Sequence, residues 1–114
     1  MYSIDLHTHS HFSDGTLSPS DLVQAALRAG VQTLALTDHD CIDGWVQAEQ
    51  AAQGTPLQLI RGVELSAQWV KPRGSKPHSV HIVGLNITNA MPLHTALIDL
   101  LRKSSWLLDE TLKN

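Results

Sequence analysis

Three histidines stand at alternate positions near the start of the chain, and an aspartate follows three residues after the last of them. These residues are His7, His9, His11 and Asp14. Side chains two positions apart on a strand point to the same face, so His7 and His9 can bind one ion together. Imidazole and carboxylate groups are the ligands that suit zinc, iron and manganese. A solvated histidine-rich loop is the alternative, and the recurrence of similar groups downstream argues against it.

Residues near the ends of later predicted strands offer the same chemistry. His39 stands within the run 37–40, Glu64 follows 62–63, and His81 lies on a further predicted strand. The carboxyl ends of parallel strands meet at one edge of an α/β barrel, which is where such folds build their sites. We therefore expect one concave surface to carry the predicted ligands. These ligands are His7, His9, Asp14, His39, Glu64 and His81.

The elements that must position these groups alternate between strands and helices. One helix starts with Ser18 as its N-cap, Pro19 at the first position and Asp21 at the third, and it stops at Gly30. Apolar runs predict the strands, and leucine spacing from about residue 92 predicts a last helix with one apolar stripe. The alternation predicts an α/β fold with a mainly parallel sheet. The predicted strands are 2–7, 31–36, 57–63 with an extended continuation over 65–70, and 79–85, and a middle helix is predicted over 42–53.

Composition sets the broad class of the protein. The 114 residues are enough for one domain or part of one, and 42% apolar with 17% charged residues is typical of a soluble globular chain. A net charge of −3 argues against a protein whose main function is to coat nucleic acid. It is compatible with a phosphorylated substrate held by metal ions. Cys41 is the only cysteine, so we expect a reducing cytoplasm. No apolar stretch or leader suggests a membrane partner.

Five short motifs occur in an order that is similar to one family, the PHP (polymerase and histidinol phosphatase) phosphoesterases. The resemblance is closest to the bacterial branch that acts on nucleotides and on RNA from its 5′ end, and it extends to about Asn86. An H-x-H pair also opens other metal-dependent hydrolases, so the specific signal is the order of all five. The motifs are His7-Thr8-His9, Ser13-Asp14-Gly15, Thr37-Asp38-His39-Asp40, Gly62-Val63-Glu64 and His81-Ile82-Val83-Gly84-Leu85.

The resemblance implies a distorted (β/α)7-type barrel with up to three divalent ions, manganese, iron or zinc. His7 and His9 would bind one ion, which Glu64 would bridge to a second ion held by His81. Asp14 and His39 would hold the third. A metal-bound water would then attack phosphorus in nucleotide phosphates or at the 5′ end of short RNA, so no side-chain nucleophile is expected.

The length of the chain departs from the family pattern. Family members are usually more than twice as long, and their later segments supply a further histidine and an Asp-x-His pair to the metals. Residues 1–114 would therefore form the N-terminal portion of a PHP domain, as a fragment or a natural truncation. We expect the chain alone to show little activity, and to associate through an exposed barrel edge or be marginally stable.

Several residues near the motifs have expected roles of their own. His11 is expected to support a metal ligand or to contact the substrate. Arg73 is expected to contact a phosphate, and the alternative is that it lies in a solvated loop without such a role. Asp38 and Asp40 are expected to contact the ligands or cap a helix, and Cys41 to be a packed thiol. His78 competes with His81, because residues three apart on a strand face opposite sides; the motif after His81 favours His81.

Two other functions compete with the phosphoesterase. A metal-dependent amidohydrolase also begins with H-x-H on a barrel strand, but the positions of Asp14, His39 and Glu64 count against it. An assay on phosphate and amide substrates would separate the two classes. A PHP module or fragment that binds metal without catalysis is the second alternative, and it would bind metal tightly without hydrolysing anything.

Overall fold

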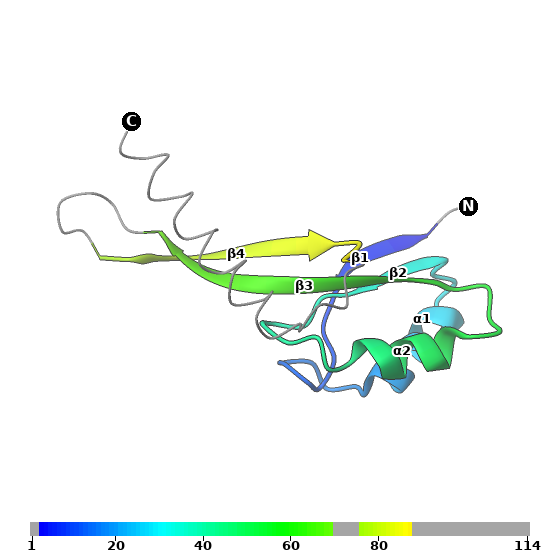
Figure 1. The fold of residues 1–114 in the computed structure, drawn as a ribbon. Helices are drawn as coiled ribbons and strands as arrows, with labels where there is room; N and C mark the ends of the chain where they lie inside the picture. Colours follow the sequence, from blue (N-terminus) through cyan, green and yellow to red (C-terminus); the bar gives the residue numbers. More distant parts are fainter. Residues whose placement is uncertain (1–2, 70–75, 88–114) are drawn as a thin grey trace. The chain divides into compact units, whose positions relative to one another are not determined.

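The computed structural model describes residues 3–69 and 76–87. Strands and helices alternate in the first part of the chain, as the sequence predicts, and two strands follow (Figure 1). The chain falls into two compact units, of which the first contains residues up to 64 together with 83–88. The second begins at residue 65. The elements are β1 (Ile4–Thr8), α1 (Pro19–Arg28), β2 (Thr33–Leu36), α2 (Trp45–Ala52), β3 (Gln58–Trp69) and β4 (His78–Leu85).

The four strands form one sheet in the order β1-β2-β3-β4. β1 pairs with β2 in parallel, with Ile4 opposite Thr33, and the register shifts between Asp5 and Thr8. β2 pairs with β3, also in parallel, with Leu34 opposite Leu59. These pairings confirm the predicted α/β fold with mainly parallel strands.

The first helix has the boundaries that its capping residues predict. The Ser18 hydroxyl accepts a hydrogen bond from the Asp21 backbone N–H at 3.1 Å, and Pro19 occupies the first turn, where no N–H is needed. Gly30 follows with φ of 80°, a left-handed conformation that glycine adopts without steric cost. The helix therefore ends where the sequence predicts.

The second helix is shorter than its predicted range of 42–53. It begins at Trp45, because the backbone contact with β3 extends as far as Asp40. The Asp40 backbone N–H donates to the Glu64 carbonyl at 3.0 Å, and Asp40 has φ of 49°, which no helix allows. Residues 40–44 are needed to turn the chain from this contact into α2.

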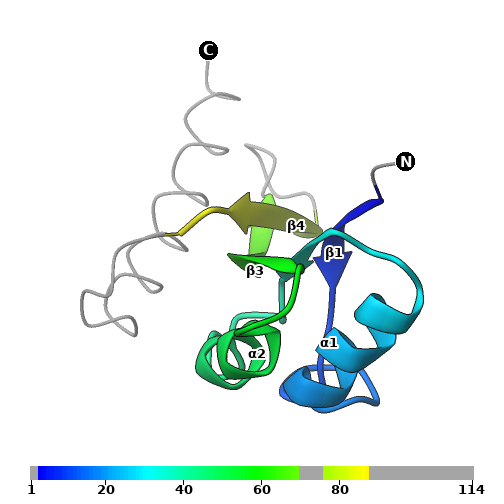
Figure 2. The same cartoon turned by 90° about the vertical axis from the view of Figure 1, so that its right-hand side faces the viewer.

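The core lies between the sheet and the two helices, which pack against each other on one side of β1, β2 and β3 (Figures 1 and 2). β2 is buried along most of its length, as expected of a strand with apolar residues on both faces. The indole N–H of Trp45 donates to the Gly62 carbonyl at 2.8 Å and so joins α2 to β3. The buried apolar residues of this unit are Val23, Ala26, Leu34, Ala35, Leu36, Trp45, Ala48, Ala52, Leu57 and Val63.

The later elements agree with prediction where the structure describes them. β3 continues through the predicted extension to Trp69, and β4 begins one residue earlier than predicted, at His78. The predicted helix from residue 92 and the residue Arg73 lie outside the described residues. Neither described helix has the length and hydropathy needed to traverse a lipid bilayer.

Candidate metal centre

Glu64 is the centre of a cluster of imidazole rings. Its side chain is only 6% exposed, and both carboxylate oxygens face histidines. Oε1 contacts Nε2 of His7 and lies 3.5 Å from Nε2 of His9, whereas Oε2 lies 3.2 Å from Nδ1 of His39. One carboxylate therefore faces histidines that come from β1, from the loop after β1 and from the end of β2.

Asp14 forms a second group with two of these histidines. Its Oδ2 lies 3.2 Å from Nε2 of His39, and its Oδ1 lies 3.7 Å from Nδ1 of His9. The rings of His9 and His39 stack, with centroids 4.5 Å apart and planes 8° apart. The Asp14 side chain is 66% exposed, so this group faces solvent while Glu64 is buried beneath it.

The sheet positions these side chains by backbone pairing. His39 and Glu64 form a parallel bridge just beyond β2, with the Glu64 N–H donating to the Asp38 carbonyl at 3.0 Å. The Thr37 hydroxyl donates to the Thr8 carbonyl at 3.0 Å and accepts the Thr8 N–H at 3.1 Å, which clamps the end of β1 to β2. Residues at the strand ends are thereby brought to one edge, as the topology predicts.

Gly62 allows the close approach of strands that this edge needs. A Cβ at this position would stand 2.7 Å from Cγ2 of Thr37 and 2.9 Å from the Gly84 carbonyl oxygen. Any larger residue would push β3 away from the threonine that clamps β1. The glycine of the Gly62-Val63-Glu64 motif thus has a packing role two residues before the buried carboxylate.

The geometry of the cluster fits divalent ions. Within the first compact unit, two groups offer ligand atoms that all lie within 4.8 Å of one another: His7, His9 and Glu64, and His9, Asp14 and His39. Two ligands of one tetrahedral ion, each about 2.1 Å from it, are about 3.4 Å apart. The separation of 3.5 Å between His9 Nε2 and Glu64 Oε1 is close to that value, as is the 3.2 Å between His39 Nε2 and Asp14 Oδ2.

His9 supplies a further argument for a cation. Its Nδ1 is buried and has no hydrogen-bond partner among the described residues. A buried polar atom without a partner is costly, and a bound ion would remove that cost. The two carboxylates of the cluster supply the negative charge that offsets the charge of such ions.

The remaining predicted site residues have different surroundings. His81 and its competitor His78 are exposed on the part of β4 that belongs to the second unit, so their roles remain predictions. His11 is exposed, and its ring packs edge-on against Phe12 at 4.9 Å. Cys41 is half-buried, and this burial raises the pKa of its thiol, which disfavours the reactive thiolate.

Sequence reasoning missed the residues that hold the ligand loop. Ser10 is fully buried, and its N–H and hydroxyl both donate to the Asp38 carboxylate. Ser13 adds a third hydrogen bond to the same carboxylate. Ser10 and Ser13 both lie between His9 and Asp14, and the presence of two hydroxyl residues in this short loop was the sequence signal for them.

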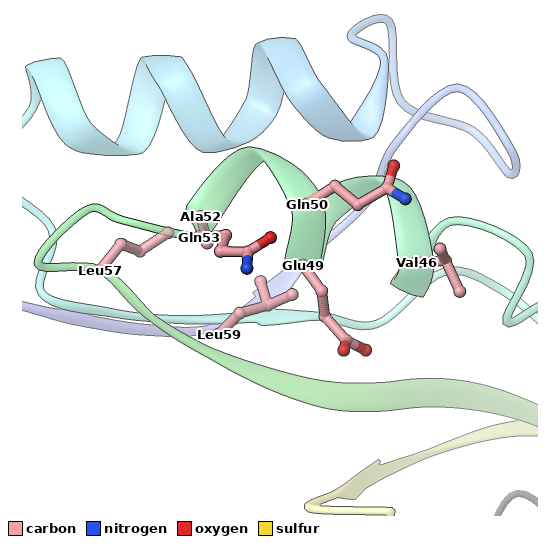
Figure 3. A pocket seen from close by; sticks show the side chains of 7 residues that line it. All are labelled: Val46, Glu49, Gln50, Ala52, Gln53, Leu57 and Leu59. Atoms are coloured by element: carbon pink, nitrogen blue, oxygen red, sulfur yellow. The ribbon is translucent and has the colours of Figure 1, made fainter.

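A hollow of about 480 Å³ lies between α2 and the start of β3 (Figure 3). Glu49 extends into it from α2, and Leu59 extends from β3. None of the predicted ligands lines it, and Glu49 is already paired with Arg61 through hydrogen bonds of 2.5 and 3.1 Å. Among residues 3–69 and 76–87, the candidate ligands therefore gather at the imidazole cluster and not in this hollow.

Two curated relatives have high sequence identity to the chain. A 5′-3′ exoribonuclease of Haemophilus influenzae is 50% identical over 94 residues, which cover 82% of this chain and 32% of the relative. A 3′,5′-nucleoside bisphosphate phosphatase of Chromobacterium violaceum is 41% identical over 103 residues, which cover 90% of this chain and 34% of the relative. The chain thus spans about a third of the length of these relatives.

Solved structures show the same architecture. A protein of Chromobacterium violaceum described as an amidohydrolase, with bound sulfate and no metal, matches with a TM-score of 0.71 and 43% identity over 85% of this chain and 32% of that chain. A protein of Bifidobacterium adolescentis assigned as a metal-dependent phosphoesterase matches with a TM-score of 0.69 and 30% identity over 86% of this chain and 32% of that chain.

A family comparison confirms the resemblance that the five motifs carry. The model of the PHP domain matches residues 5–104, which include every predicted ligand. The match therefore covers most of the chain, and the fold and the relatives agree with it. On these grounds the chain belongs to the PHP domain family.

Proposed function

We propose that the chain provides metal ligands for a phosphoesterase that hydrolyses phosphate esters of nucleotides or of short RNA. The observation that carries this proposal is the pair of ligand groups that share His9 above the buried Glu64 carboxylate. Relatives of the chain include an exoribonuclease and a nucleoside bisphosphate phosphatase. The family match favours this class over the amidohydrolases.

Each residue of the cluster has a defined task in this proposal. His7, His9 and Glu64 would hold one ion, and Asp14 and His39 a neighbouring one. Bound divalent ions supply Lewis acidity, which lowers the pKa of water and offsets the charge of phosphate oxygens. The protein itself positions the imidazole rings, buries Glu64 between them and exposes Asp14 to solvent.

Three further assignments belong to the proposal. His81 would be an additional ligand, which its place in the fifth motif supports. His11 and Arg73 would contact the phosphate or sugar of the substrate. A net charge of −3 means that bound cations must provide much of the attraction for an anionic substrate, manganese, iron and zinc being the candidates.

The test is metal content and turnover, measured on the full-length protein and not on residues 1–114 produced alone. His9→Ala should lower bound manganese by about 10-fold or more, as is typical when a residue of a metal site is lost. His94→Ala is the matched control, because His94 is outside the proposed ligand set. Hydrolysis of a nucleoside bisphosphate, with none of an amide substrate, is the expected activity. Unchanged metal content in His9→Ala, or metal binding without any phosphate release, would contradict the proposal.

We also propose that the chain, when produced by itself, associates with copies of itself through β1. This strand is at one end of the sheet, and its apolar residues Ile4 and Leu6 are 59% and 38% exposed. An exposed apolar edge strand is a template for pairing with another chain. A cytoplasmic location is proposed on the single cysteine, Cys41.

A further inference from the structure

Asp38 is a buried carboxylate that the proposed metal site does not use as a ligand. It lies between Thr37 and His39 at the end of β2, and it is 1% exposed. A buried carboxylate is costly unless hydrogen bonds stabilise it. The donors that Asp38 uses therefore indicate what its side chain contributes to the structure.

All three of its described side-chain donors come from the loop between His9 and Asp14. The Ser10 backbone N–H donates to Oδ1 at 2.6 Å, and the Ser10 hydroxyl donates to Oδ2 at 2.7 Å. The Ser13 hydroxyl donates to Oδ1 at 2.9 Å. The loop is thus fastened to Asp38 immediately after His9 and immediately before Asp14.

The Ser10 end of the loop carries its own hydrogen bonds to the turn that presents Asp14. The Ser10 carbonyl accepts the N–H of Ser13 at 3.1 Å and the N–H of Gly15 at 2.9 Å. Its hydroxyl oxygen also accepts the Phe12 N–H at 3.2 Å. A displacement of Ser10 would therefore move the residues on both sides of Asp14.

The backbone of Asp38 is fixed to the strands that carry the other ligands. Its carbonyl accepts the Glu64 N–H at 3.0 Å, and the next residue, His39, bridges to Glu64. Asp38 consequently joins two parts of the cluster. Its backbone belongs to the sheet edge with His39 and Glu64, and its side chain holds the loop with Asp14.

We propose that Asp38 is a positioning residue that holds Asp14 against His39 and thereby sets the affinity of the ion bound there. This inference rests on the proposed function, because it assigns Asp38 a task toward a metal ligand. Asp38 acts through the loop, by fixing Ser10 and Ser13. It does not bind the ion itself.

A double-mutant cycle on the intact protein tests this role, with Mn²⁺ alone as the probe and free Mn²⁺ measured by electron paramagnetic resonance. Asp38→Ala should weaken Mn²⁺ binding by about 10-fold or more, and Ser13→Ala by a smaller factor. In an Asp14→Ala background either change should alter binding less than about twofold, because residues that act through one group are not additive. Ser79→Ala, at an exposed serine, is the matched control.

The conservative variant separates positioning from a general loss of structure. Asp38→Asn keeps the shape and the Oδ1 acceptor for two of the three donors, so it should recover most of the affinity that Asp38→Ala loses. Ser13→Ala removes one hydrogen bond to Asp38 and leaves both Ser10 bonds in place. The cycle can therefore be measured with Ser13→Ala if Asp38→Ala yields little folded protein. Equal losses in the parent and Asp14→Ala backgrounds would overturn the inference.

The proposed function and this inference fail in different ways. Mn²⁺ binding that His9→Ala leaves unchanged would overturn the proposed function, and Mn²⁺ binding that Asp14→Ala leaves unchanged would overturn the assignment of Asp14 as a ligand and, with it, the role of Asp38. Mn²⁺ binding that depends on Asp14 but is unaffected by Asp38→Ala and Ser13→Ala would overturn only the role of Asp38.

Discussion

Replacing Gly15 with alanine should open the loop that carries Asp14. A Cβ at this position would stand 2.3 Å from the His9 carbonyl oxygen, 2.7 Å from its carbonyl carbon and 2.9 Å from the Ser10 carbonyl oxygen. All three atoms belong to the backbone, so no flexible side chain can move aside. Since Cβ contacts under 3.0 Å essentially never occur, the His9 carbonyl must shift by about 0.7 Å, the difference between 3.0 and 2.3 Å.

The magnitude follows from two losses. Forcing an extra methyl group into a packed site costs about 1–3 kcal/mol. The shift also disturbs the hydrogen bond from the Gly15 N–H to the Ser10 carbonyl, 2.9 Å long, which contributes about 1 kcal/mol. We therefore expect the free energy of unfolding to fall by about 2–4 kcal/mol, measured by equilibrium unfolding in urea.

Gly84→Ala is the matched control for this substitution. A Cβ at Gly84 would meet its nearest neighbour, Cδ1 of Ile87, at 3.6 Å, which is an ordinary van der Waals contact. The control should unfold at the same urea concentration as the parent protein or at a slightly higher one. Unfolding of Gly15→Ala at the parental urea concentration, or an equal loss in both variants, would refute the reasoning from close backbone contact.

Three further substitutions have expected outcomes. Thr37→Val keeps the side-chain shape but removes the hydroxyl that accepts the Thr8 N–H, so stability should fall by about 1–3 kcal/mol in urea unfolding while Thr37→Ser retains most of it. Trp45→Phe leaves the Gly62 carbonyl without its indole donor and should cost about 1–3 kcal/mol in the same assay; no loss would show that this bond is replaced. Ile4→Lys should shift the chain, produced alone, to a smaller species in light scattering, and an unchanged mass would argue against association through β1.

The sequence predicts much of the fold because its signals are local. Ser18 and Pro19 define the start of α1, Gly30 its end, and the apolar run before Thr37 defines a strand buried on both faces. The start of α2 could not be obtained in this way. It depends on Asp40 donating to the Glu64 carbonyl, a contact between residues far apart in the sequence.

The sequence likewise predicts some features of the candidate metal centre and not others. The order of the motifs predicts which side chains are candidates, and five of the six predicted ligands lie in contact within one unit: His7, His9, Asp14, His39 and Glu64. The sequence does not predict that Glu64 lies between the rings or that His9 is shared by two groups. Those facts depend on the register of β1, β2 and β3, which spacing along one chain does not specify.

The loop between the two histidine groups shows why a motif is more than its ligands. β1 has a register irregularity and its residues 4–7 are exposed, so the strand alone does not hold His9 and Asp14 in place. The hydroxyl of Thr37 fixes the end of the strand, and Asp38 fixes the loop that follows. Both residues precede His39 in the third motif. That motif therefore contributes one candidate ligand of its own and the two contacts on which the candidate ligands of the first two motifs depend.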